Sequence, residues 1–243
     1  STTSVDPVAK IADVCHQESI WLHVDAAYAG TAAIVPEKAS ILQGCEQADS
    51  LVVNPHKWLF TPFDLSAFYC RRMDVVRATF ALTPDYLATT ETGVTNLMDT
   101  GVQLGRRFRA LKLWAVPRYF GAAGIRSRLT EHMRLAQLFS GWVDDSDNFE
   151  RLAPVPLSVV CFRARPATLA WTDTQLDALN ARILDAVNAS GEVFLSHTQL
   201  DGRFALRLAV GHIRTEEHHV RRAWELLNEA MIHAAGDVPV TDG

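Results

Sequence analysis

Two short apolar runs near the start of the chain each lead to a residue that can take part in chemistry. Residues 20–24 read Ile-Trp-Leu-His-Val and stop at Asp25, whereas residues 50–53 read Ser-Leu-Val-Val and lead within four residues to Lys57. Apolar runs of this length are typical of buried strands. The 32 residues from Asp25 to Lys57 are enough for one crossover between two strands of a sheet. The pattern predicts an α/β fold with both residues at the sheet edge where ligands bind.

A carboxylate and an amine at neighbouring strand ends match the needs of pyridoxal phosphate. Lys57 would form the Schiff base, and Asp25 would keep the pyridine nitrogen protonated so that the ring acts as an electron sink. The amine must be neutral to attack an aldehyde, and burial near a cationic ring lowers the pKa of a lysine. Taken singly, such a lysine is usually a solvated surface residue and such an aspartate a turn former. Their matching positions favour the cofactor.

Longer motifs surround both residues: His-Val-Asp-Ala-Ala-Tyr-Ala-Gly over 23–30 and Asn-Pro-His-Lys-Trp over 54–58. They resemble the group II pyridoxal-phosphate-dependent decarboxylases, the family of aromatic-L-amino-acid decarboxylase. The resemblance continues through residues 82–87, 104–114 and 206–211, and so runs over nearly the whole chain. Several long motifs in the right order are far more specific than one short pattern.

The resemblance implies an α/β fold of the pyridoxal-phosphate-dependent transferase type, which is fold type I, the aspartate-aminotransferase-like fold. We expect residues 1–115 to be the C-terminal part of the large cofactor-binding domain and residues 116–243 to be a small C-terminal α+β domain. The first part shows only about three strands, fewer than is usual for a sheet buried on both faces. We therefore expect a missing N-terminal segment of the same enzyme to supply the phosphate-binding turn, the histidine stacked on the ring and much of the substrate pocket.

The resemblance also suggests roles for residues around the two strand ends. Ala27 would let the cofactor ring lie flat against the backbone. His56 and Asn54 resemble residues that contact the phosphate or orient the cofactor, although His56 could instead be a simple cap on the strand end. His23 points to the same face as Asp25, and we expect a satisfied core histidine, bonded to that carboxylate, rather than a catalytic one.

Tyr86 is expected to determine the outcome of the reaction. After carbon dioxide leaves, the quinonoid carbanion must receive a proton at Cα, and a phenol on a closing loop can deliver it while the lid excludes water. In relatives that form an aldehyde this position resembles a phenylalanine, so tyrosine favours simple decarboxylation. The alternative is an ordinary exposed loop tyrosine. Trp58 and Phe60 are expected to pack rather than react.

Residues 104–119 are predicted to form an amphipathic helix that carries Arg106, Arg107 and Arg109. Three arginines could indicate an anion site. On a helix with aromatic neighbours they are more often a packed and salt-bridged face, so we leave them out of the catalytic set. Gly105 stands where family members line the substrate pocket, and it could affect selection by side-chain size.

Local signals predict further elements. Residues 8–17 have the apolar period of a helix, and residues 157–163 read as a strand. Residues 172–190 and 215–235 are predicted helices, and Asp201-Gly202 is the signal of a two-residue hairpin turn between two strands.

Composition excludes several other partners. The formal charge is −5 and no Lys/Arg run is present, which argues against nucleic acid. No apolar stretch is long enough to span a bilayer, and the nine histidines show no metal-ligand spacing. The four cysteines are scattered, which favours free thiols and a cytoplasmic location.

The leading hypothesis is decarboxylation of an L-amino acid, aromatic in kind, to the amine and carbon dioxide. The resemblance also suggests a homodimer with the active site near the subunit interface. One rival is an oxidative aldehyde synthase, and another is a decarboxylase of an acidic or diamino acid. A non-catalytic binding protein of the same fold is the rival from a different class, and the joint presence of Lys57, Asp25 and Tyr86 argues against it.

Overall fold

The computed structural model describes residues 1–81, 93, 95–167 and 170–236, with only the backbone of Ala235 and Gly236. Tyr86 and the motif over 82–87 lie outside the described residues. Within the described ranges, no helix combines the length and the apolar character that crossing a membrane requires.

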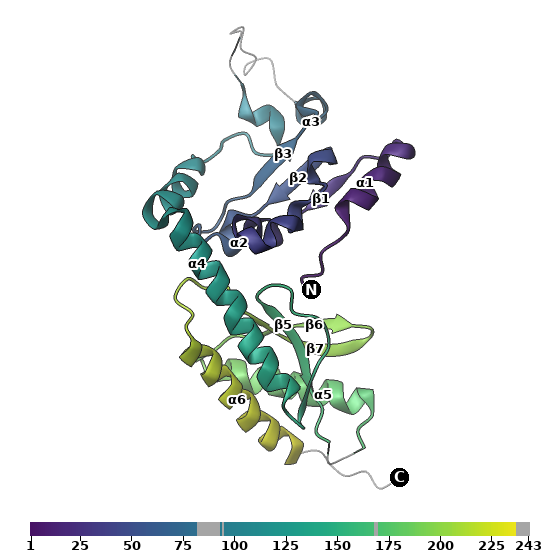
Figure 1. Ribbon diagram of the computed structural model, residues 1–243, viewed down its shortest axis with the longest axis vertical. Helices are drawn as coiled ribbons and strands as arrows, with labels where there is room; N and C mark the ends of the chain where they lie inside the picture. Colours follow the sequence, from purple (N-terminus) through teal and green to yellow (C-terminus); the bar gives the residue numbers. More distant parts are fainter. Residues whose placement is uncertain (82–92, 94, 168–169, 237–243) are drawn as a thin grey trace. The chain divides into compact units, whose positions relative to one another are not determined.

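The chain divides into two compact units (Figure 1), and each is described by itself. The N-terminal unit comprises Pro7–Ala122. The C-terminal unit comprises Ala123–Gly243 together with Ser1–Asp6.

A three-stranded sheet lies at the centre of the N-terminal unit, in the order β1-β2-β3. Its strands are β1 (His23–Asp25), β2 (Ser50–Val53) and β3 (Ala67–Cys70). β1 runs parallel to β2, with Asp25 opposite Val52, and β3 runs antiparallel to β2. Parallel neighbouring strands need a crossover connection, so the crossover predicted between the two apolar runs is confirmed.

Short helices surround this sheet. They are α1 (Val8–Gln17), η1 (Ala29–Ile34), η2 (Pro36–Leu42), η3 (Cys45–Gln47), α2 (Pro55–Trp58), α3 (Met73–Phe80) and η5 (Leu97–Thr100). α1 has the bounds predicted from its amphipathic period. The crossover from β1 to β2 consists of the three 3-10 helices rather than one long α-helix, which keeps the connection compact.

Helix α4 (Ala110–Asp144) begins later than the sequence predicts. Residues 104–109 are not helical, because their side chains bind elsewhere: Arg106 donates to the Thr100 hydroxyl and Arg109 to the Asp64 carboxylate. Such tertiary contacts override local helix propensity. The helix is interrupted at Gly121 (φ 65°, ψ 166°) rather than at Pro117, since glycine adopts positive φ without a steric cost.

The C-terminal unit contains an antiparallel sheet with the strand order β4-β5-β7-β6. Its elements are β4 (Phe149–Arg151), β5 (Val159–Ala164), α5 (Asp173–Ala189), β6 (Ser196–Leu200), β7 (Arg203–Ala209) and α6 (Glu217–Gly236). The hairpin prediction is confirmed, because Asp201 and Gly202 both have positive φ, 50° and 77°, as a type I′ turn requires. Thr172 caps α5 in a capping box with Gln175.

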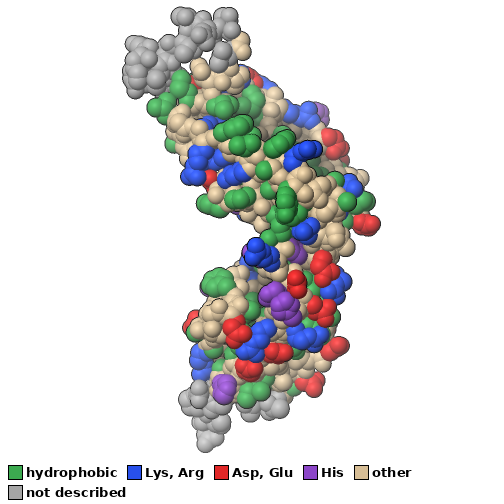
Figure 2. Space-filling view, turned by 90° about the vertical axis from the view of Figure 1, so that its left-hand side faces the viewer, with side chains coloured by type: hydrophobic (Ala, Val, Ile, Leu, Met, Phe, Trp, Pro, Cys, Tyr) green, Lys and Arg blue, Asp and Glu red, His purple; other side chains and the backbone are tan. Residues whose placement is uncertain are grey.

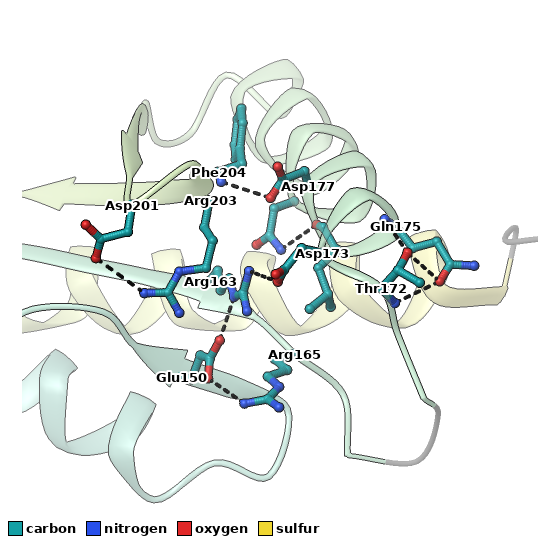
Figure 3. A network of polar contacts seen from close by, with 12 residues as sticks. Glu150, Arg163, Arg165, Thr172, Asp173, Gln175, Asp177, Asp201, Arg203 and Phe204 are labelled. Carbon is teal, nitrogen blue, oxygen red and sulfur yellow. Dashed lines mark hydrogen bonds and ion pairs between the residues drawn. The ribbon is translucent and has the colours of Figure 1, made fainter.

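An ion-pair network joins β4, β5 and α5 (Figure 3). The Arg163 side chain is only 4% exposed, and it donates to Glu150 at 2.5 Å and to Asp173 at 3.1 Å. Glu150 also receives a hydrogen bond from Arg165 at 3.0 Å. These arginines hold the pKa of the Glu150 carboxyl below its usual range despite its partial burial. The buried guanidinium is thus paired, which a buried charge requires.

The two units differ in how well their apolar side chains are covered. In the described part of the C-terminal unit, few large apolar side chains are exposed, whereas the N-terminal unit exposes many. Figure 2 shows apolar side chains recurring over one face of the N-terminal unit, while charged side chains cover much of the C-terminal unit. Exposed examples in the N-terminal unit are Trp21, Phe68, Tyr69, Phe108, Trp114 and Tyr119. Patches of this kind usually mark a protein interface.

Candidate active site

The backbone brings the ends of β1 and β2 together beyond the strands themselves. The Ala26 N–H donates to the Val52 carbonyl at 3.0 Å, and the Asn54 N–H donates to the Ala27 carbonyl at 2.9 Å. The one-turn helix α2 starts directly after Asn54. The segments that carry Asp25 and Lys57 therefore lie side by side at the carboxyl edge of the two parallel strands.

Asp25 and Lys57 are both exposed at this edge. Oδ1 of Asp25 accepts a hydrogen bond from the Ala27 N–H at 2.9 Å, which fixes the carboxylate against the backbone turn. The Lys57 N–H donates to the Asn54 carbonyl at 2.9 Å. Neither side-chain charge takes part in an ion pair within the described residues, so both are available to a ligand.

The other predicted site residues lie close along the chain to these two. Ala27 is buried, with 6% of its surface exposed. Oδ1 of Asn54 accepts a hydrogen bond from the Ser66 hydroxyl at 2.5 Å. Nδ1 of His56 lies 3.0 Å from the Leu65 amide nitrogen and 2.5 Å from its carbonyl oxygen. One nitrogen of His56 is thus committed to the backbone in either tautomer.

The expectation that His23 bonds to Asp25 is wrong. Nδ1 of His23 lies 2.8 Å from the hydroxyl of Ser50, which also receives a hydrogen bond from Trp21 at 2.9 Å. His23 and Ser50 are direct partners in the β1–β2 register, which places the hydroxyl beside the ring. The ring is exposed rather than in the core.

Trp58 and Phe60 pack against other rings, as predicted. Trp58 is fully buried and stacks on Tyr28, with 4.8 Å between ring centroids and 12° between planes. Phe60 meets Phe120 edge to face at 6.5 Å. The Tyr28 contact was not predicted from the sequence, although both aromatic residues belong to the two motifs and each follows a proposed site residue.

Three further features of the N-terminal unit are an ion pair, an exposed glycine and a cavity. An ion pair between Asp64 and Arg109, which the sequence did not reveal, anchors the loop that follows α2. Gly105 is exposed, and its pocket role stays a prediction, as does the role of Tyr86. A cavity of about 860 Å³, lined by residues that include Trp21, lies at the amino ends of β1 and β2, away from Asp25 and Lys57.

The donor set at the carboxyl edge fits pyridoxal phosphate. An aldehyde needs a primary amine, a pyridine nitrogen that stays protonated needs a carboxylate, and a flat ring needs a small neighbouring side chain. Lys57, Asp25 and Ala27 supply these groups, and His56 and Asn54 add polar atoms beside them.

Comparison with known proteins identifies the fold and the family. Residues 1–165 match the profile of the pyridoxal-dependent decarboxylase conserved domain. A solved structure of the Oryza sativa enzyme TDC, with pyridoxal phosphate and tryptamine, superposes with a TM-score of 0.88 at 39% identity, over 96% of this chain and 49% of that one. The fold is fold type I of the pyridoxal-phosphate-dependent enzymes. The chain belongs to the pyridoxal-dependent decarboxylases.

Curated relatives support the same family assignment. Tryptophan decarboxylase TDC1 of Camptotheca acuminata is 40% identical over 94% of this chain and 46% of its own length. Phenylacetaldehyde synthase of Arabidopsis thaliana is also 40% identical, over 94% of this chain and 47% of its own length. The chain spans about half the length of the curated relatives it matches.

Proposed function

We propose that this chain is part of a pyridoxal-phosphate-dependent carboxy-lyase that converts an aromatic L-amino acid to its amine and carbon dioxide. The observation that carries the proposal is the placement of Asp25 and Lys57 at the carboxyl ends of two parallel strands, where neither charge forms an ion pair with another described residue. That is the edge of an α/β sheet where ligands bind.

Each residue of the site has a distinct proposed task. Lys57 holds the cofactor covalently through Nζ, and Asp25 holds a proton on the ring nitrogen. Ala27 lies against the ring face, while His56 and Asn54 orient the cofactor or its phosphate. When bound, pyridoxal phosphate supplies the electron sink for the charge left on Cα as carbon dioxide departs.

Tyr86 is the residue that we expect to separate amine formation from aldehyde synthesis. Aldehyde synthesis is the alternative because the chain is also similar to a phenylacetaldehyde synthase. We propose that its phenol delivers a proton to Cα of the substrate, which yields the amine. The aromatic substrate class is supported by the names of the relatives, among them tryptophan and tyrosine/DOPA decarboxylases.

We further propose that residues 1–115 are the C-terminal part of the large cofactor-binding domain and that residues 116–243 form the small C-terminal domain. The exposed apolar side chains of the N-terminal unit support coverage by a preceding segment of the same enzyme and by a second subunit of a homodimer. The four cysteines, all described and all free, support a cytoplasmic location.

The direct test is to find which lysine carries the cofactor. The holoenzyme should absorb visible light, and borohydride reduction should fix the cofactor to the peptide that contains Lys57. The chain holds three other lysines, Lys10, Lys38 and Lys112, and a label on one of them would refute the assignment. Incubation with L-tryptophan, L-tyrosine and L-glutamate, with separate assays for amine, aldehyde and oxygen uptake, tests the reaction and its substrate class.

A further inference from the structure

The loop over residues 59–66, which joins α2 to β3, is held to the site by two contacts. The Leu65 backbone lies against Nδ1 of His56, as described above. The Phe63 ring meets the His56 ring edge to face, with 5.0 Å between centroids. Because His56 directly precedes Lys57, a displacement of this loop would disturb a residue proposed to orient the cofactor.

The same loop is anchored on its other side to the start of α4. The Arg109 guanidinium donates to both carboxylate oxygens of Asp64, with Nε–Oδ1 at 3.3 Å and Nη2–Oδ2 at 3.2 Å. Nζ of Lys112 donates to the Pro62 carbonyl at 2.8 Å. Asp64 therefore lies between Phe63 and Leu65, the two residues that contact His56.

The geometry and charge of this pair suit a fixed anchor. A fork of two parallel hydrogen bonds restrains orientation as well as distance, and the Arg109 side chain is only 22% exposed. The guanidinium lowers the pKa of the Asp64 carboxyl, so the pair is charged at neutral pH.

A second Arg–Asp pair in the N-terminal unit differs from this one in exposure and in sequence separation. Arg72 and Asp74 are two residues apart and form a 2.7 Å ion pair, with side chains 59% and 65% exposed. Within the part of the chain that the structure describes, this pair connects no residue distant in sequence. Asp64 and Arg109 are 45 residues apart, and their contact ties the site loop to another element.

We propose that Asp64 and Arg109 are positioning residues for the cofactor: their ion pair holds the 59–66 loop in place, and through Phe63 and Leu65 it fixes the ring of His56. The inference rests on the proposed function, because it needs the site at Lys57 to bind pyridoxal phosphate.

The test measures cofactor affinity by spectroscopic titration of the whole enzyme, first freed of cofactor, with pyridoxal phosphate. Arg109→Met and Asp64→Asn should each weaken binding by about tenfold, by analogy with the lower end of the range found when partners that orient metal-binding side chains are removed. Asp64→Glu keeps a carboxylate and should recover most of the affinity. Arg72→Met is the matched control and should bind as wild type does.

Two combined variants show whether the loss of cofactor affinity depends on the ion pair and on His56. The double variant Asp64→Asn/Arg109→Met should bind no worse than either single variant, because both remove one interaction. In a His56→Gln background, Arg109→Met should cause no further loss. Urea midpoints of the cofactor-free proteins should change little, since the pair is partly exposed.

Wild-type affinity in Arg109→Met would overturn the proposal, and so would an undiminished loss in the His56→Gln background. Failure of the proposed function is a different observation: the wild-type enzyme would then take up no pyridoxal phosphate at Lys57, whatever the variants do.

Discussion

Gly30 packs so closely against β2 that a single added methyl group should strain the backbone next to the site. A Cβ built on Gly30 would lie 2.8 Å from Cγ2 of Val53, 3.3 Å from its Cγ1 and 3.2 Å from Cβ of Ala26. The Gly30 N–H donates to the Ala26 carbonyl at 2.8 Å, so the turn cannot move away without weakening that bond. Gly30→Ala should therefore strain the turn that follows Asp25.

The expected cost combines two opposed effects. Overpacking a tight contact costs about 1–3 kcal/mol, whereas replacing glycine with alanine restricts the unfolded chain and stabilises by about 0.4–1 kcal/mol. The net loss should be about 1–2 kcal/mol in the free energy of unfolding. Urea unfolding of the purified protein measures it, and pyridoxal phosphate titration shows whether the site shifts as well.

Two further variants check the cause. Val53→Ala removes the methyl groups that the new Cβ would meet, so in that background Gly30→Ala should cost much less. Gly211→Ala is the control, because a Cβ there meets nothing within 4 Å. Wild-type stability for Gly30→Ala, or strictly additive effects of Gly30→Ala and Val53→Ala, would refute the packing argument.

Three other predictions concern the chemistry and the pH response. Asp25→Asn should still bind the cofactor but lose turnover by roughly 10- to 100-fold, the worth of one hydrogen bond to a charged group; steady-state kinetics with normal turnover would contradict its role. Tyr86→Phe should lower amine formation by about 100-fold or more and raise aldehyde and peroxide, which product analysis with and without oxygen measures; an unchanged product ratio would exclude Tyr86 as the proton donor. Burial lowers the pKa of His132 from 6.5 to about 4, so the unfolded chain binds a proton below pH 6.5 that the folded chain excludes. Stability should therefore fall by about 3 kcal/mol between pH 7 and pH 4, and His132→Leu should remove that part; identical pH profiles in urea unfolding would show the assignment to be wrong.

Features that depend on neighbours in sequence could be predicted. The bounds of α1 follow from its amphipathic period, and the turn at Asp201-Gly202 follows from the backbone conformations these two residue types accept. The placement of Asp25 and Lys57 at adjacent strand ends follows from two apolar runs and the length of chain between them. The first two need only local information, whereas the third also depends on the length of chain that a crossover between parallel strands requires.

Features that depend on partners distant in sequence could not be predicted. The start of α4 was misplaced because Arg109 bonds to Asp64, and nothing local distinguishes it from an exposed helical arginine. His23 was given the wrong partner because the choice between Ser50 and Asp25 depends on strand register. β4 has only three residues, too few to show a periodic pattern.

Helix α2 fixes the number of residues between Asn54 and Lys57. It is a single turn of four residues, and its first position follows directly on the last residue paired with Ala27. One inserted or deleted residue between Asn54 and Lys57 would rotate the lysine by roughly 100° about the helix axis. Related enzymes should therefore share this spacing without gaps. Their insertions and deletions should gather instead in the part of the crossover between Ile34 and Asp49, which holds the 3-10 helices η2 and η3.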